Sequence, residues 1–561
     1  MTPPVLLNDD DCYLALKAKD ARFDGRFFTG VTSTGIYCRP VCSVKTPLRK
    51  NCRFFGHAAQ AERAGFRPCL RCRPELAPHS VSWCIQDASY ILAHQAARML
   101  DELDMASTLV ASDPALPPEG AAAPAVLHSR SCGPDQPGTP ATVSIAPAQP
   151  EAAGVAWGSA SVQPPSVKAL AERLGVSDRH LRRIFEAQFG VSPLQYLQTR
   201  RLLTAKQLLA DTDMPVTQVA LVSGFASVRR FNAAFVQHYR LNPTQMRQQQ
   251  ARSPHEAITV RLGYRPPYDV ASMLAFVETH RINAIEFIAA DAHHTSIGRT
   301  LSIESGGKTH AGWLLAHFDE PRSQLVLQVS DSLCEVLPLV IRRVRALFDL
   351  DADPAAINSV LHASFPGGDG LRVPGALDGY ELAVRAVLGQ QVTVAAARTL
   401  AQRLVDRFGE PIETPWPQLT RLFPAPAVLA TASSDALGQL GIVRQRQAAI
   451  NGIARGVAEK RLQLHGGADV NATIAQLKAL PGIGDWTAQY IALRALNWPD
   501  AFPAGDVALH KMLGVQKRKA PAREAEKISL AWKPWRSYAV IRAWSGLLVT
   551  APDAPHTPET P

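Results

Sequence analysis

The sequence predicts a multidomain, mainly α-helical protein that also contains two small α/β units. Its 561 residues exceed what a single hydrophobic core organises, so three or four domains are expected. Helical periodicity of apolar residues extends over residues 167–250 and resumes from about residue 333. Between these stretches, the strand-like runs AIEFIAA and QLVLQVS follow a helix expected at residues 271–279, which indicates a small α/β unit.

The composition divides the chain into four domains. They are a cysteine-bearing α/β domain at residues 1–80, a helical domain at residues 85–250, an α/β unit at residues 257–330 and a helical domain at residues 331–550. An insert at about residues 107–165, rich in Ala, Pro, Gly and Ser, interrupts the first helical domain. Its few large apolar side chains cannot offset the cost of ordering, so we expect it to be disordered.

Charge and hydropathy limit the partners and the compartment. The net charge is +10 and the pI is about 9.2, which favours a polyanionic partner. No segment has the run of roughly 18 apolar residues that a membrane span needs, and the first residues lack a cationic signal-peptide head. We therefore expect a cytoplasmic protein without a membrane partner. Nine cysteines in such a chain indicate metal binding or catalysis rather than disulfides.

Four of these cysteines have the spacing of a metal site. Cys38 and Cys42 are separated by three residues, Cys69 and Cys72 by two, and 26 residues lie between the pairs. This pattern predicts tetrahedral coordination of Zn²⁺ by thiolates, which would also supply folding energy to a small segment. From the spacing alone, a purely structural zinc site remains open.

Basic side chains surround these cysteines, and Glu62 is the single acid between residues 39 and 73. The basic residues are Arg39, Lys45, Arg49, Lys50, Arg53, Arg63, Arg67, Arg71 and Arg73. They predict a surface that contacts the phosphate backbone of nucleic acid. The runs FDGRFFTGVTSTGIYCRPVCSVKTP and RFFGHAAQAERAGFRPCLRCRPELAP resemble the N-terminal domain of the bacterial adaptive-response protein Ada. The resemblance implies that Cys38, the first of the four cysteines, accepts a methyl group from a DNA methylphosphotriester.

The chemistry of a zinc thiolate is compatible with that role. Zinc keeps the thiols deprotonated at neutral pH, so a bound sulfur can displace a methyl group from oxygen. Methylation removes one negative charge, which weakens repulsion from DNA phosphates and should raise DNA affinity.

Residues 167–250 contain two helix-turn-helix patterns. In each, a turn glycine and a capping serine precede a helix that carries basic side chains early in its length. The predicted DNA-binding residues are Arg179, Arg182 and Arg183 in the first unit, and Arg229 and Arg230 in the second. The run GFASVRRFNAAFVQHYRLNPTQMR resembles the AraC/XylS regulators, which implies binding to promoter DNA and a partnership with RNA polymerase. A generic helical bundle with a basic face is the alternative.

The run LPGIGDWTAQYIALRAL has the form of a helix-hairpin-helix. Gly482 and Gly484 permit a tight hairpin whose backbone amides can meet a DNA phosphate at the N-terminus of the next helix. By itself this motif indicates DNA binding without sequence preference, and a scaffolding turn is the alternative.

Residues 258–548 resemble the bacterial 3-methyladenine DNA glycosylase II family in YRPPYDVASMLAF, VRAVLGQQVTVAAA, LPGIGDWTAQY, FPAGD and WKPWRSYAVIRAW. The resemblance implies that Asp506 is the catalytic carboxylate and that Trp486, Tyr490 and Trp544 bind the flipped base. Electron-rich rings can stack on a cationic alkylated base. Without the resemblance, Asp506 would be assigned as a helix cap and the three rings as core aromatics.

Gln390 and Gln391 occupy the loop that the glycosylase family inserts into the duplex. A leucine is typical of the second position, so Gln391 is a departure and the identity of the inserted residue stays open. Glycosylases with lyase activity carry a Schiff-base lysine where Trp486 stands, so we expect a monofunctional hydrolase.

Taken together, the motifs predict a protein for the adaptive response to DNA alkylation. It would accept methyl groups at zinc, regulate transcription and excise alkylated bases of the 3-methyladenine type from double-stranded DNA. One alternative is a zinc-containing AraC-family transcription factor whose glycosylase-like domain is inactive and only binds DNA. Another is a glycosylase that two inert binding domains direct to DNA.

Overall fold

The computed structural model describes residues 8–79, 88–106, 166–248, 257–290 and 294–546. The insert predicted to be disordered, at residues 107–165, lies outside the described residues. Among the described helices, none combines the length and the apolar composition needed to cross a membrane.

The N-terminal domain is a four-stranded sheet with two helices. The strands lie in the order β3-β1-β2-β4, in which β1 is antiparallel to β2 and β3 while β2 is parallel to β4. The rings of Phe28, Tyr37 and Phe66 pack in its small core. The elements are α1 (Asp9–Ala18), β1 (Phe28–Val31), β2 (Ile36–Cys38), β3 (Cys52–Phe55), α2 (Ala58–Arg63) and β4 (Arg67–Pro68).

The regulator-like region folds into two helix-turn-helix units joined by a long helix. Positive φ angles at Gly175 (+68°) and Gly224 (+87°) make the two turns. The hydroxyls of Ser177 and Ser227 accept hydrogen bonds from the first turns of the second helices, as expected of N-caps. The helices are α3 (Ala88–Ala106), α4 (Val167–Arg173), α5 (Asp178–Phe189), α6 (Pro193–Asp211), α7 (Val216–Val222), α8 (Val228–Tyr239) and α9 (Pro243–Gln248).

The predicted α/β unit is a five-stranded antiparallel sheet with one helix. The strand order is β5-β9-β8-β7-β6. The elements are β5 (Ile258–Gly263), α10 (Val270–His280), β6 (Glu286–Ala290), β7 (Thr295–Ser305), β8 (Lys308–Asp319) and β9 (Gln324–Val329).

The rest of the described chain is helical, as the periodicity indicates. Trp532 and Trp535 are buried in the core of its last helices. The helices are α11 (Leu337–Leu347), α12 (Pro354–Leu361), α13 (Gly379–Leu388), α14 (Val394–Phe408), α15 (Pro426–Thr431), α16 (Ser434–Gly438), α17 (Arg444–Ala458), α18 (Val470–Lys478), α19 (Asp485–Arg494), α20 (Val507–Met512), α21 (Pro521–Ser529) and α22 (Arg536–Trp544).

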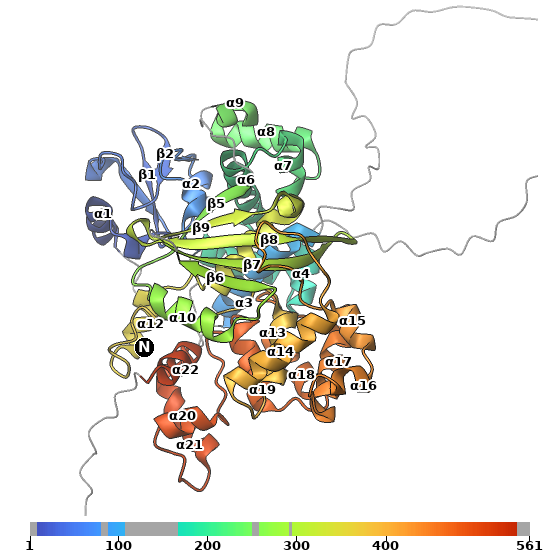
Figure 1. Cartoon of the computed structure of the whole chain (residues 1–561). Coiled ribbons are helices and arrows are strands. Elements are labelled where there is room, and N and C mark those ends of the chain that lie inside the picture. Colours follow the sequence, from blue (N-terminus) through green and yellow to red (C-terminus); the bar gives the residue numbers. More distant parts are fainter. Residues whose placement is uncertain (1–7, 80–87, 107–165, 249–256, 291–293, 547–561) are drawn as a thin grey trace, which may run out of the picture.

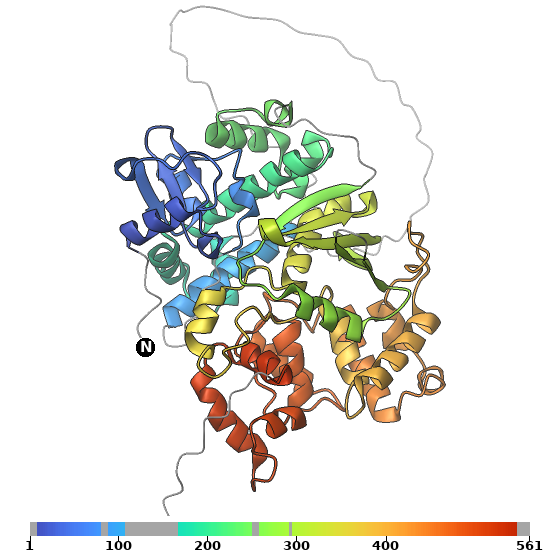
Figure 2. The ribbon, with the colours of Figure 1, turned by 60° about the vertical axis from the view of Figure 1, so that its left-hand side comes forward.

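One hydrophobic core joins the second helix-turn-helix unit to the five-stranded sheet. Phe231 and Phe235 of α8 belong to the same buried cluster as Val260 of β5, Leu327 of β9 and Val340 of α11. The sheet consequently lies between the second helix-turn-helix unit and the C-terminal helices, an arrangement that is visible in both views (Figures 1 and 2).

Buried charges attach the N-terminal domain to the same body. Arg73 donates two hydrogen bonds to Asp211 of α6, at 2.7 and 2.9 Å, and Lys206 of α6 pairs with Glu75. Arg265, which is fully buried, donates to backbone carbonyls on both sides of the domain boundary, including that of Asp24 at 2.8 Å. Because each buried charge has a partner, separating the domains would expose several unpaired groups.

Candidate functional sites

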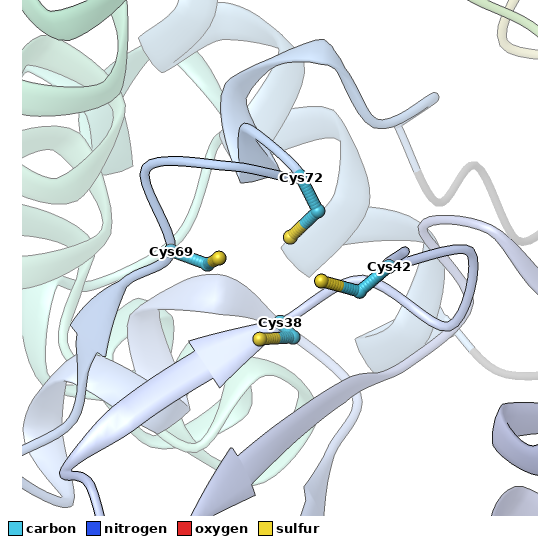
Figure 3. A group of neighbouring side chains, drawn as sticks. All are labelled: Cys38, Cys42, Cys69 and Cys72. Atoms are coloured by element: carbon cyan, nitrogen blue, oxygen red, sulfur yellow. The ribbon is translucent and has the colours of Figure 1, made fainter. Parts of the chain in front are cut away.

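The four predicted ligands converge at the edge of the N-terminal sheet. Cys38 ends β2, Cys42 follows in the next turn, and Cys69 and Cys72 lie in the loop after β4. Their sulfur atoms all lie within 4.8 Å of one another and point to a common centre (Figure 3). Tetrahedral zinc with Zn–S bonds of about 2.3 Å separates its sulfurs by about 3.8 Å, so the arrangement fits this ion.

Hydrogen bonds distinguish the four sulfurs. The backbone N–H of Arg39 donates to Cys72 Sγ at 3.4 Å, and backbone N–H groups of Val44 and Cys72 bond to the sulfurs of Cys42 and Cys69. Such bonds stabilise a thiolate and reduce its tendency to attack carbon.

Not all of the predicted basic residues form a DNA-facing surface. The Arg39 side chain is buried, where its Nε donates to Asp24 at 2.8 Å. Arg73 is engaged by Asp211, and Arg63 donates to the carbonyl of Gly190 at 2.5 Å. For Arg39 and Arg73 the expectation of a phosphate contact is therefore wrong, because buried acids that are distant in sequence neutralise them. The exposed basic residues of this segment include Lys45, Lys50, Arg53 and Arg71.

The predicted recognition helices present their basic side chains outward. Arg179, Arg182 and Arg183 are exposed on α5, and Arg229 and Arg230 are exposed near the start of α8. Arg182 forms an i,i+4 ion pair with Asp178 at 3.0 Å, which is weak at an exposed site.

Asp506 and the three predicted aromatic residues form one constellation. Asp506 caps α20 through a 2.7 Å hydrogen bond from the Leu509 N–H to its Oδ1. The indole of Trp486 donates to Oδ2 at 2.7 Å, and that of Trp544 donates to Oδ1 at 3.2 Å. The Trp486 and Tyr490 rings are stacked with centroids 5.2 Å apart. The Asp506 carboxylate thus has two roles: it caps α20, and it places a negative charge beside aromatic rings.

Arg494 is a member of this constellation that the sequence analysis missed. Its Nη1 donates to the Tyr490 hydroxyl at 2.7 Å, and its guanidinium carbon lies 5.5 Å from the centre of the Tyr490 ring. Its Nε donates to the carbonyl of Pro374 at 2.7 Å, so the charge is held in place. The i,i+4 spacing of Tyr490 and Arg494 on a predicted helix is the signal that could have found it.

The hairpin between α18 and α19 has the geometry that the motif predicts. Gly482 has a φ of +83°, and a Cβ there would lie 2.9 Å from the carbonyl of Gln445. Gly484 precedes α19 at an exposed position where a Cβ would meet no atom within 4 Å. The fold therefore requires glycine at position 482, while position 484 leaves room for a ligand to approach the helix N-terminus.

The two predicted loop residues differ in their surroundings. Gln390 donates to the Gly482 carbonyl and to the Thr487 hydroxyl, both at 2.9 Å, and so joins the loop to the hairpin. Gln391 is exposed and has a φ of +52°. Gln391 is thus the residue of the pair that projects from the surface.

Four family models match the chain in this order along the sequence. They are the metal binding domain of Ada at residues 11–75, a helix-turn-helix domain at 170–249, the AlkA N-terminal domain at 259–378 and the HhH-GPD superfamily of base excision DNA repair proteins at 384–536. The four-cysteine centre is accordingly a zinc site, and the other domains make DNA the partner.

Similar proteins cover either the whole chain or one of its halves. The DNA-3-methyladenine glycosylase 2 of Escherichia coli is 33% identical over 283 residues, which are 50% of this chain and 95% of that protein. The regulatory protein Ada of Salmonella typhimurium is 31% identical over 225 residues, 40% of this chain and 45% of that protein. A probable bifunctional transcriptional activator/DNA repair enzyme AlkA of Mycobacterium tuberculosis is 33% identical over 550 residues, 96% of each chain. The chain therefore belongs to the family of bifunctional transcriptional activators and DNA repair enzymes.

Proposed function

We propose that the C-terminal half excises alkylated bases of the 3-methyladenine type from double-stranded DNA by monofunctional hydrolysis of the N-glycosidic bond. The observation that carries this proposal is the carboxylate of Asp506 beside the rings of Trp486, Tyr490 and Trp544, next to a DNA-binding hairpin.

The proposed mechanism uses the negative charge of Asp506 and the aromatic rings beside it. A flipped cationic base stacks on the aromatic side chains, while the Asp506 carboxylate faces the sugar. As the glycosidic bond breaks, the carboxylate stabilises the oxocarbenium-like sugar and orients the water that attacks it. Trp486 cannot form a Schiff base, so the abasic strand is released uncut.

We infer that Gln391 enters the space that the flipped base leaves. It projects from the loop beside the hairpin, whereas hydrogen bonds hold Gln390 in place. The amide of Gln391 can hydrogen-bond the opposite base where a leucine would only fill space.

The experiment is incubation of the chain with methylated duplex DNA, followed by chromatography of the free bases and electrophoresis of the strands. We expect release of 3-methyladenine and strands that break only after alkali treatment. Duplex binding without any released base would instead identify an inactive, DNA-holding domain.

For the zinc site, we propose that Cys38 accepts the methyl group of a methylphosphotriester. Backbone hydrogen bonds to the sulfurs of Cys42, Cys69 and Cys72 lower their nucleophilicity, which favours Cys38 as the methyl acceptor. Its sulfur would attack the methyl carbon, the phosphate oxygen would leave with the electron pair, and zinc would keep a thioether ligand. Peptide mass spectrometry after exposure to methylphosphotriester DNA should find the added methyl on Cys38. A methyl on Cys69, or none, would refute the assignment.

We further propose that methylation promotes promoter binding through α5 and α8 and recruitment of RNA polymerase, in the cytoplasm. The loss of one negative charge near DNA phosphates should raise promoter affinity, and the gain should shrink as salt rises. Titrations of methylated and unmethylated protein at two salt concentrations test this. A gain that is independent of salt would point to a conformational change instead.

A further inference from the structure

The second helix-turn-helix unit and the repair unit share one hydrophobic core. Phe231 and Phe235 of the recognition helix α8 are completely buried in a core that also contains Val260 and Leu327 of the five-stranded sheet. Rotating one unit against the other would expose this core, at about 1.5–3 kcal/mol for each large apolar side chain. The DNA-reading surfaces therefore keep fixed directions.

The second recognition helix and the hairpin lie on opposite sides of the five-stranded sheet (Figure 1). Helix α8 lies at one end of the molecule, and helices α18 and α19, which flank the hairpin, lie at the other (Figure 1). The separation persists when the molecule is turned (Figure 2). The buried side chains of α8 pack into the core of this distant unit, and Arg229 and Arg230 are exposed near the start of the helix.

The stiffness of DNA determines what such an arrangement can bind. Bending a site of 20–30 base pairs by 40–90° costs about 1–6 kcal/mol, and a duplex that passed from α8 to the hairpin would have to bend further. A short duplex on α8 is therefore out of reach of Asp506 in the same molecule.

We propose that one chain holds two duplex segments at once, a promoter on the second helix-turn-helix unit and damaged DNA on the hairpin. This inference rests on the proposed DNA-binding roles of both halves. A molecule bound at a promoter would then remain able to capture and repair a second duplex, or a distant segment of the same DNA that loops back. Tethering raises the local concentration of the repair site around the regulated gene.

The test is a sandwich assay with the full chain. One duplex, enriched on this chain from a random-sequence pool, is fixed to beads, and a short fluorescent duplex carries a tetrahydrofuran abasic analogue. We expect the beads to retain the fluorescent duplex only when the chain is present, with an affinity within about twofold of that in solution because the two surfaces are separate. Light scattering should give one chain and two duplexes per complex.

Charge-reversal variants separate the two surfaces. Arg229→Glu with Arg230→Glu should abolish capture on the beads while binding of the abasic duplex in solution persists. Gly484→Asp, at a position where a side chain meets no atom, should leave the chain bound to the fixed duplex but abolish binding of the abasic duplex both on the beads and in solution, because the new carboxylate repels phosphate.

Each unfavourable outcome has a distinct meaning. If the fixed duplex displaces the abasic duplex, or if the complex contains two chains, the inference is wrong while the proposed function stands. If the chain fails to bind the abasic duplex even in solution, the proposed repair role fails as well.

Discussion

Replacing Asp506 with asparagine separates the charge of this residue from its role as a helix cap. Two of its hydrogen bonds, from the Leu509 N–H and from Trp544, fall on Oδ1, and the bond from Trp486 falls on Oδ2. The carbonyl oxygen of asparagine can replace Oδ1, so α20 keeps its cap. The asparagine NH₂ would then face the Trp486 indole N–H, and two donors would oppose each other.

These three hydrogen bonds set the expected changes in stability and in the rate of base release. One hydrogen bond to a charged acceptor is lost, worth about 1.5–3 kcal/mol, but the cost of holding a charge at a site only 9% exposed also disappears. The free energy of unfolding should therefore fall by less than about 2 kcal/mol. Base release should slow by about 100-fold or more, because the charge opposing the oxocarbenium ion is gone. Asp506→Ala, which also removes the cap, should lose about 1 kcal/mol more stability.

The assay compares three measurements on each variant: single-turnover release of 3-methyladenine, equilibrium binding to an abasic-analogue duplex, and urea unfolding. Asp506→Asn should fail only in the first. Near-normal release would remove Asp506 from the mechanism. Parallel loss of release and DNA binding would mean that this residue serves only as a structural cap.

Three further substitutions test other parts of the structure. Lys206→Met should lower the free energy of unfolding by about 3 kcal/mol, because Glu75 loses its buried cation; an unchanged urea midpoint would show that Arg73 alone suffices. Burial raises the pKa of Asp349 to about 7, so folding favours its protonated form and the stability of the protein should fall as the pH rises towards 7. Asp349→Asn, which suits the φ of +49° there, should remove this pH dependence and be more stable at pH 8 by about 2 kcal/mol; equal urea stability of both proteins at pH 8 would refute this. Gln391→Leu should weaken binding to an abasic duplex several-fold, because a leucine fills the vacated space but cannot hydrogen-bond the opposite base; unchanged binding would argue that residue 391 stays outside the duplex.

Much of the architecture could be predicted because its signals are local. The cysteine spacing, the capping serines of the two helix-turn-helix units and the turn glycine Gly482 all reflect constraints within a few residues, and the structure contains each feature. The helix expected at residues 271–279 is observed as α10 (Val270–His280). The grouping of Asp506 with its aromatic neighbours came from family resemblance, since no spacing rule links residues 486, 506 and 544.

The missed features depend on partners that are distant in sequence. Arg39 and Arg73 were predicted to contact DNA because the acids that neutralise them, Asp24 and Asp211, are distant in the sequence. The core shared by the second helix-turn-helix unit and the sheet was equally hidden, because an amphipathic helix looks the same whether its apolar face covers its own domain or a neighbour. Periodicity shows that a face is buried but does not show what covers it.

That shared core has a consequence for the lifetime of the molecule. Transfer of a methyl group to a zinc-bound sulfur, as proposed for Cys38, happens once per chain, so a used sensor can be cleared only by degradation. A protease that unfolds the second helix-turn-helix unit disrupts the hydrophobic core that this unit shares with the strands of the repair half. The cell would then discard an undamaged catalyst whenever it discards a spent sensor, and the supply of repair enzyme would follow the turnover of the signal.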